Sequence, residues 1–372
     1  MTVKAVCTIV SLAFIFLWLY CFQSDVLYVA QHILSGGHTH YNRVVGAVLI
    51  TALLWLVQAL TFRILRLRKR SHALTWFPSM LLLAVLTSVS PDSANCYNLS
   101  IWMWLIPLTV LIWGGAVWVA RLFQPYEPDR RGAFVRCLWI NLLILALLMA
   151  GVAASSNTNA VYHFRAHAEV ALLDGDFDEA LRVGSRSLET DDGLMMLRMY
   201  ALSRQGLLGE RLFEYPLVPS SHAMLPTGES SPQMQVYPVD SLYRHLGAIP
   251  RRPMTPMAYL QTILRSRQAK PAAADYLLCG YLIDRDLDAF ARTVSQFYTL
   301  NDSMPRYYRE ALILYTHKRS QPVAVYHDTV LDEDYDDWQK MKTACATDSE
   351  RKGMALENYA DSYWYYYEYA SR

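Results

Sequence analysis

Three histidines lie close together in a stretch whose residue types could do chemistry. His32 is followed by Gly36-Gly37-His38-Thr39-His40. Neighbouring imidazoles can hold a metal ion, and adjacent glycines allow a backbone to approach a ligand closely. The nearest carboxylate is Asp25, so a solvated turn is favoured, and we expect no metal and no cofactor. His38 and His40 are candidate binding residues.

The C-terminal end of the chain is rich in tyrosine. Tyr359, Tyr363 and Tyr366 fall on one face of a helix, which favours packing of a last hydrophobic layer. Trp364 and Tyr365 lie among them, and aromatic rings of this kind also stack on sugars or on a partner. Both are therefore candidate binding residues, with a glycan as the alternative to packing.

The acidic run at residues 332–337 has the negative charge of a calcium-binding loop, but its residues do not match the positions of an EF-hand. Position six of an EF-hand would be Asp337 instead of glycine, and position twelve would be Thr343 instead of glutamate. We predict a solvated acidic turn before a helix. Pairs such as Asp176 with His163 have no spacing that supports catalysis, so we predict no catalytic residue.

The six cysteines include no Cys-x-x-Cys pair and no Cys/His spacing typical of zinc. In an oxidising compartment Cys96 could pair with Cys279 or with Cys345. Three cysteines cannot all pair with one another, so at least one stays free. The pairing is left open.

The elements that must position these residues fall into two halves. Of 372 residues, 53% are hydrophobic, and the long apolar runs concentrate in residues 1–155. An apolar helix of about 20 residues crosses a hydrocarbon core of about 30 Å. We predict five transmembrane spans, at about residues 5–22, 44–62, 74–89, 101–120 and 137–154. The polar residues Gln58 and Asn141 lie within them, but no ionisable side chain does, which favours an anchoring bundle over a transporter.

Cations in the short loops predict the orientation. Arg63, Arg66, Arg68, Lys69 and Arg70 follow the second span, and the loop after the fourth is also rich in arginine. Because such loops stay in the cytoplasm, we predict a multi-pass protein with a cytoplasmic N-terminus and residues 156–372 outside. The formal net charge of +1 gives no reason to expect nucleic acid as a partner.

Residues 156–372 show helical periodicity interrupted by short turns. Gly175 begins Gly-Asp-Phe-Asp-Glu-Ala-Leu, similar to the turn between paired helices of a tetratricopeptide repeat, and Gly209 lies 34 residues later, the period of that repeat. Eight of the sixteen prolines fall in residues 215–256, which predicts an extended loop with at most one helical turn, near residues 240–246. The fold class is therefore all-α: about five transmembrane helices followed by an α-solenoid of tetratricopeptide-like helical hairpins.

Two motifs carry a family resemblance: Leu-Gly-Glu-Arg-Leu-Phe-Glu-Tyr-Pro at residues 208–216 and Met-Pro-Arg-Tyr-Tyr-Arg-Glu-Ala-Leu-Ile-Leu-Tyr at residues 304–315. They resemble a family of uncharacterised multi-pass membrane proteins of Bacteroidales. The resemblance implies a bacterial inner-membrane setting, and it implies no activity or catalytic residue.

These patterns together predict a non-enzymatic protein of the cell envelope. Its partners would be membrane lipids and an envelope protein or peptide bound by the periplasmic helical-repeat domain, since stacked helix pairs present an extended surface. The alternative is a membrane-surface enzyme or carrier that acts on a lipid-linked or glycan substrate through His38 and His40.

Overall fold

The structure, a computed structural model, describes residues 2–90, 97, 99–123, 133–226 and 234–370. These residues form helices and no strand, apart from one isolated antiparallel bridge between Val89 and Tyr97. The chain divides into two compact units, residues 1–166 (unit 1) and residues 167–372 (unit 2).

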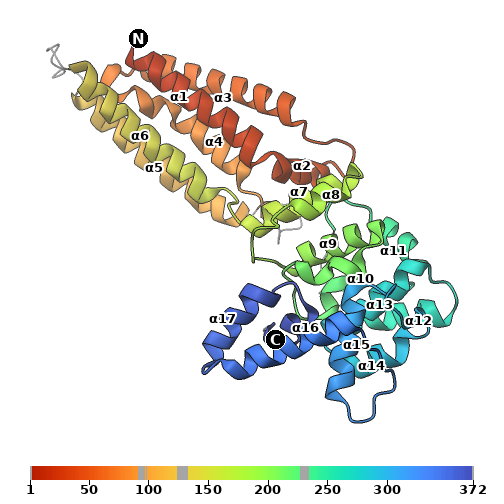
Figure 1. Ribbon diagram of the computed structural model, residues 1–372. Helices are drawn as coiled ribbons and strands as arrows, with labels where there is room; N and C mark the ends of the chain where they lie inside the picture. Colours follow the sequence, from red (N-terminus) through yellow and green to blue (C-terminus); the bar gives the residue numbers. More distant parts are fainter. Residues whose placement is uncertain (1, 91–96, 98, 124–132, 227–233, 371–372) are drawn as a thin grey trace. The chain divides into compact units, whose positions relative to one another are not determined.

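Unit 1 is a bundle of long helices that lie side by side (Figure 1). Its helices are α1 (Val3–Leu17, continued by a π-helical turn over Trp18–Phe22), α2 (Ser24–Leu34), α3 (Arg43–Leu65), α4 (Phe77–Thr87), α5 (Leu99–Phe123) and α6 (Ala133–Ser155). The core between them is built from apolar side chains, including Ile15, Leu54, Trp76, Leu83 and Leu145.

Within the described parts of the chain, four helices are long and apolar enough to cross a membrane: Val3–Phe22, Arg43–Leu65, Ser100–Phe123 and Phe134–Ser155. At most 22% of each hydrophobic window is buried within the bundle. Leu49, Leu111 and Leu147 are each more than 60% exposed. An apolar surface of this extent needs a hydrocarbon environment, so length and composition indicate a membrane protein.

The third predicted span, at residues 74–89, is wrong as a long helix. Residues Lys69–Trp76 form a 3₁₀ helix (η2), and α4 that follows has only 11 residues, about 17 Å at 1.5 Å per residue. Pro78 lies in the first turn of α4. Proline has no N–H to donate to the preceding turn, so it is well placed in the first turn of α4, where the helix begins.

The two polar residues noted in the predicted spans hold η2 in place. Asn141 donates to the carbonyl oxygens of Lys69 and Arg70 at 2.8 and 3.0 Å and accepts from the Ala73 N–H at 2.7 Å. Gln58 donates to the Thr75 hydroxyl at 2.9 Å. Backbone groups left unpaired by a break in an apolar bundle are costly, and these side chains satisfy several of them.

Cationic residues gather at one end of the bundle. The Lys4 ammonium at the start of α1 lies 4.3 Å from the ring centre of Phe62 near the end of α3. Arg121, near the end of α5, donates to the Leu65 carbonyl at 3.1 Å. Arg63 lies in the last turn of α3, and the loop that follows it adds further cations at the same end. The opposite end holds α2, Ser88 and the residues that follow α6.

Unit 2 is built from short helices. They are the end of α7 (Ala160–Leu173), α8 (Phe177–Arg182), α9 (Asp192–Gln205), α10 (Leu208–Arg211), α11 (Val239–Leu246), α12 (Pro256–Arg265), α13 (Pro271–Ile283), α14 (Leu287–Val294), α15 (Arg306–Lys318), α16 (Thr329–Ala344), α17 (Asp348–Tyr359) and α18 (Tyr363–Tyr369). Gly175, with a φ of 77°, ends α7, and the Asp176 carboxylate caps α8 by accepting the Glu179 N–H at 2.9 Å. This turn lies where the sequence pattern placed it.

Helices far apart in sequence pack together in unit 2. In a solenoid each repeat contacts its neighbours, whereas α10 packs against α15 and α13, and α18 packs back onto α15. Figure 1 shows α10, α13 and α15 gathered in the middle of the unit. These helices therefore share a core, and the architecture of the described residues is all-α.

The proline-rich segment is packed and partly helical. It contains a 3₁₀ turn at Ser221–Met224 and α11, and Met224, Leu225 and Val236 are buried. The backbone N–H groups of Val236 and Tyr237 donate to the buried Glu169 carboxylate at 2.6 and 2.9 Å. The described parts of residues 215–256 thus contribute to the core, and the prediction of an extended loop holds only between these helical pieces.

The acidic run differs from its prediction, whereas the open question of cysteine pairing is not tested. Residues 332–337 lie inside α16, so the predicted turn before a helix is wrong; Asp328 caps that helix by accepting the N–H groups of Val330 and Leu331. Cys279 and Cys345 are buried and unpaired. The Cys279 sulfur lies 3.5 Å from the Tyr308 hydroxyl instead. Cys96 lies outside the described residues.

Candidate functional site

The two motifs that carry the family resemblance lie against each other. A Cβ added to Gly209 would lie 2.7 Å from the Tyr308 ring and 2.9 Å from Pro305, so glycine is required for this approach of α10 to the start of α15. The Glu210 carboxylate accepts the backbone N–H of Arg306 at 2.7 Å. It thereby satisfies an unpaired donor at the N-terminus of α15, where the helix dipole favours negative charge.

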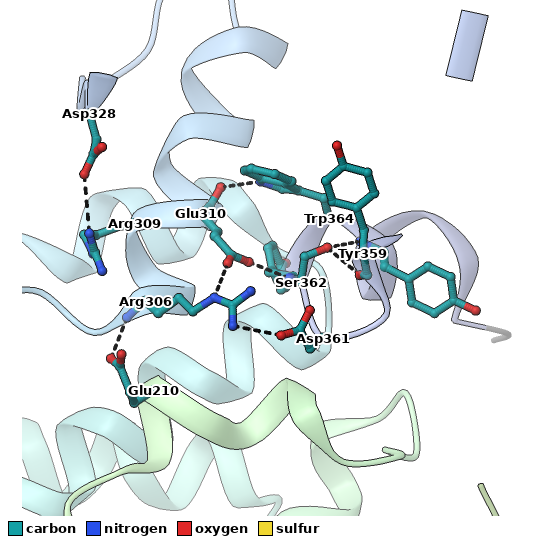
Figure 2. A network of polar contacts seen from close by, with 11 residues as sticks. Glu210, Arg306, Arg309, Glu310, Asp328, Tyr359, Asp361, Ser362 and Trp364 are labelled. Atoms are coloured by element: carbon teal, nitrogen blue, oxygen red, sulfur yellow. Dashed lines mark hydrogen bonds and ion pairs between the residues drawn. The ribbon is translucent and has the colours of Figure 1, made fainter. Parts of the chain in front are cut away.

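A polar network follows from this contact and centres on Glu310 (Figure 2). Its side chain is 2% exposed and forms an ion pair with Arg306, one helical turn earlier, at 2.7 Å. It also accepts the backbone N–H of Tyr363 at 2.7 Å. Arg306 reaches Asp361 at 3.0 Å. Glu310 therefore joins α15 to the first residue of α18, and Arg306 joins it to the turn before that helix.

Burial controls the protonation of Glu310. Loss of hydration disfavours the carboxylate and raises its pKa from 4.5 to about 7, while Arg306 and the Tyr363 N–H act in the opposite direction. The residues around Glu310 are aromatic and backbone groups, with Arg306 and Asp361 as the charged neighbours.

Aromatic rings complete the junction between the two motifs and α18. The Phe213 ring lies 4.9 Å from Tyr307, 5.0 Å from Tyr363 and 4.8 Å from Tyr366, measured between ring centres. The Tyr363 and Tyr366 hydroxyls donate to the carbonyl oxygens of Leu282 and Ile283 at 3.1 and 2.9 Å. The last helix thus closes the core with rings whose hydroxyls are paired.

The structure places the candidates Trp364 and Tyr365 in this junction. Trp364 is 2% exposed, and its indole N–H donates to the Glu310 carbonyl at 3.0 Å. Tyr365 is half-buried, with its ring centre 5.5 Å from that of Tyr369. A sugar could reach Trp364 only after α18 had moved, whereas part of Tyr365 is accessible as it stands.

The candidates His38 and His40 lie in the turn between α2 and α3. The His40 Nε2 is 3.0 Å from the His32 Nδ1, and its ring stacks on Tyr28 with centres 4.9 Å apart. His38 is exposed. Burial, with His40 as a second cause, lowers the pKa of His32. Among the described residues no group of three or more His, Cys, Asp or Glu side chains could hold a metal ion.

A second surface feature precedes α16. Residues 323–327 lie outside the helices, with bends at Val323 and Ala324. Their side chains alternate: Ala324 and Tyr326 are buried, whereas Val323 is 71% and Val325 is 53% exposed. Val330, in the first turn of α16, is 65% exposed. We refer to Val323, Val325 and Val330 as the exposed valines.

Polar contacts fix the segment that carries the exposed valines. The Tyr326 hydroxyl donates to Asp302 at 3.0 Å and to Asp328 at 3.3 Å, and Arg309 pairs with Asp328 at 3.3 Å. The Val323 N–H donates to the Tyr315 hydroxyl at 3.3 Å. Because Tyr326 and Asp328 fix this segment, Val323 and Val325 are exposed to solvent at defined positions.

Sequence reasoning missed the role of Arg306 and Glu310 and missed the exposed valines. A signal was present for each. Arg306 and Glu310 have the i, i+4 spacing of a helical ion pair, and Val-Ala-Val-Tyr at residues 323–326 alternates exposed valines with inward side chains. The residues that bind these groups are distant in sequence. Glu310 accepts the N–H of Tyr363, and the Tyr326 hydroxyl donates to Asp302.

One comparison with known proteins gives a match. Residues 253–370 match a family of unknown function (DUF6057). The matched region runs from just before α12 to the end of α18 and includes Arg306, Glu310 and the exposed valines, while Gly209 and Glu210 precede it. No curated protein and no solved structure matches the chain. The prediction of similarity to a family without an assigned activity is confirmed for residues 253–370.

Proposed function

We propose that this chain is a non-enzymatic multi-pass membrane protein whose unit 2 serves as a scaffold for an envelope protein or peptide. The exposed valines carry the proposal. The segment before α16 directs the apolar side chains of Val323 and Val325 outward, where they can serve as anchors for a partner. Its anchoring by Tyr326 and Asp328 lowers the ordering cost of binding.

The chemistry of the partner follows from this surface. Three valines offer small, branched apolar contacts, so the partner would present an apolar patch or an extended segment with alternating apolar residues. Next to them the exposed His327 side chain interacts with Asp332 at 3.2 Å, which supplies a polar rim. Interfaces of this kind have an apolar centre and a polar border.

The proposal includes an orientation in a bacterial inner membrane. The cationic end of unit 1 would face the cytoplasm, because lysine and arginine concentrate on that side. The N-terminus lies at this end, and Ser156 and Asn157, after α6, lie at the other. Between the ends the chain returns through η2 and α4, so residues 156–372 would lie in the periplasm. The tetratricopeptide-like ancestry of the helical pairs is part of the same proposal.

The experiment that tests the proposal replaces the exposed valines in the full-length protein. A Val323→Asp, Val325→Asp double variant should lose co-purification of a specific envelope protein while keeping its membrane level. Leu188→Asp is the matched control, because Leu188 is an apolar residue of unit 2 that is 82% exposed. Equal co-purification by the double variant and the wild type would rule out this surface as the docking site.

A further inference from the structure

A cavity of about 300 Å³ opens at the cationic end of unit 1. One side is formed by the start of η2 and the residue before it, with Arg68, Arg70 and Ser71. The other side is the last part of α5, including Ala116, Ala120 and Phe123. The cavity therefore has a cationic rim and an apolar wall.

The wall on α5 is accessible because this helix packs loosely. Only 6% of its hydrophobic window is buried, the lowest value among the four long helices. A second groove of about 650 Å³ lies at the opposite end of the same helix, where Trp102, Leu105 and Thr109 face Gly151 and Ser155 of α6. Grooves thus flank α5 near both ends.

Asn141 of α6 fixes the backbone next to the cationic rim. The carbonyl oxygens of Lys69 and Arg70 both accept from the Asn141 amide, and the Ala73 N–H donates to the same side chain. Arg121 on α5 is bonded to the Leu65 carbonyl and adds a further positive charge at this end of the bundle. Arg68 and Arg70 consequently project from a backbone that is fixed against α6.

We propose that this cavity binds an anionic phospholipid, with its phosphate at Arg68 and Arg70 and an acyl chain against α5. Basic pockets between membrane helices on the positively charged side favour anionic headgroups, and arginine suits phosphate through paired N–H donors. The apolar wall favours a lipid over a free anion, because inorganic phosphate would leave Ala116, Ala120 and Phe123 without a partner. The inference rests on unit 1 lying in a membrane and is independent of the protein partner proposed for unit 2.

Native mass spectrometry of the full-length protein in detergent tests the site, with phosphatidylglycerol as the probe and phosphatidylcholine as the neutral comparison. We expect phosphatidylglycerol to bind in preference to phosphatidylcholine, and an Arg68→Gln, Arg70→Gln variant to bind it about tenfold more weakly. The control is an Arg63→Gln, Arg136→Gln variant, which removes the same charge from residues that do not line the cavity. It should bind like the wild type.

Two further arms separate a lipid in the cavity from a free anion and from an effect of charge alone. Ala116→Phe fills the cavity without changing charge and should weaken phosphatidylglycerol binding; Ala120→Phe serves the same purpose if the first variant does not fold. Inorganic phosphate at the same concentration should not displace the lipid. The proposal is overturned if the control variant loses as much binding as the Arg68 and Arg70 variant, if the two lipids bind equally, or if inorganic phosphate displaces phosphatidylglycerol completely.

Discussion

The carboxylate of Glu310 accepts the backbone N–H of Tyr363 at 2.7 Å, across 53 residues of sequence. This bond joins the centre of α15 to the first residue of the last helix. Both ends of the bond are buried, with Glu310 at 2% and Tyr363 at 0% exposure. This carboxylate therefore contributes to the position of α18, together with the hydroxyl bonds of Tyr363 and Tyr366.

The pH dependence of stability should reveal Glu310. Burial raises its folded-state pKa from 4.5 to about 7, so its contribution to stability is fully present below pH 4.5 and is lost as the pH rises through about 7. The shift corresponds to at most roughly 3 kcal/mol. Thermal unfolding of the full-length protein should show the wild type losing stability relative to Glu310→Gln between pH 5 and pH 7.5. A wild-type advantage that grows with pH would mean that the ion pair with Arg306 outweighs burial.

The approach of α10 to α15 predicts a sharp difference between two glycine substitutions. Gly209→Ala places a Cβ 2.7 Å from the Tyr308 ring, so it should destabilise the protein by about 1–3 kcal/mol through overpacking. Gly353→Ala in α17 meets nothing within 4 Å and should stabilise it by about 0.5–1 kcal/mol. Denaturant unfolding in detergent compares the two, and equal effects would contradict the packing of these motifs.

Substitutions of Trp364 and Tyr365 should distinguish a packing role from sugar binding. Trp364→Phe loses the bond to the Glu310 carbonyl and should cost about 1 kcal/mol or somewhat more, whereas Tyr365→Phe should change stability little. Oligosaccharides should leave the tryptophan fluorescence of the wild type unchanged. A sugar-induced change that disappears in Trp364→Phe would instead assign this junction to glycan recognition.

The turn between α2 and α3 gives a test of the enzyme or carrier alternative. His40→Ala removes the bond to His32 and the stacking on Tyr28, so it should loosen residues 35–42, as measured by hydrogen exchange, while His38→Ala should not. The pKa of His32 is lowered in the folded state, so neutral His32 contributes to folding stability above pH 6.5. This stability is lost as the pH falls through the folded-state pKa. Loss of cellular function in both variants at normal protein level would favour the alternative.

Sequence reasoning predicted the elements that depend on local pattern. The runs ending at Phe62 and Ala154 are continuous apolar segments, and each is a long helix. The prediction of a span at residues 74–89 failed because the apolar run covers the change from the 3₁₀ helix η2 to the short helix α4, and hydropathy averages over that change. The turn at Gly175 was predictable because its glycine and following aspartate act locally.

The candidate site could be predicted only in part. Trp364 was recognised as an aromatic residue on a helix, but its contacts with the Glu310 carbonyl and the Tyr335 ring are distant in sequence. Gly209 was noted for its spacing from Gly175, whereas its role comes from contact with Tyr308. Contacts between distant helices depend on tertiary packing, and the periodicity of a single sequence does not predict them.

The most direct test of the scaffold proposal is photo-crosslinking in native membranes from a reactive residue placed at Val325. The same residue at Leu188, on another exposed part of unit 2, serves as the control. The proposal predicts one specific envelope protein joined at position 325, absent at position 188, and lost when Val323 is replaced by Asp. Identical products from both positions, or no protein product from position 325, would contradict it.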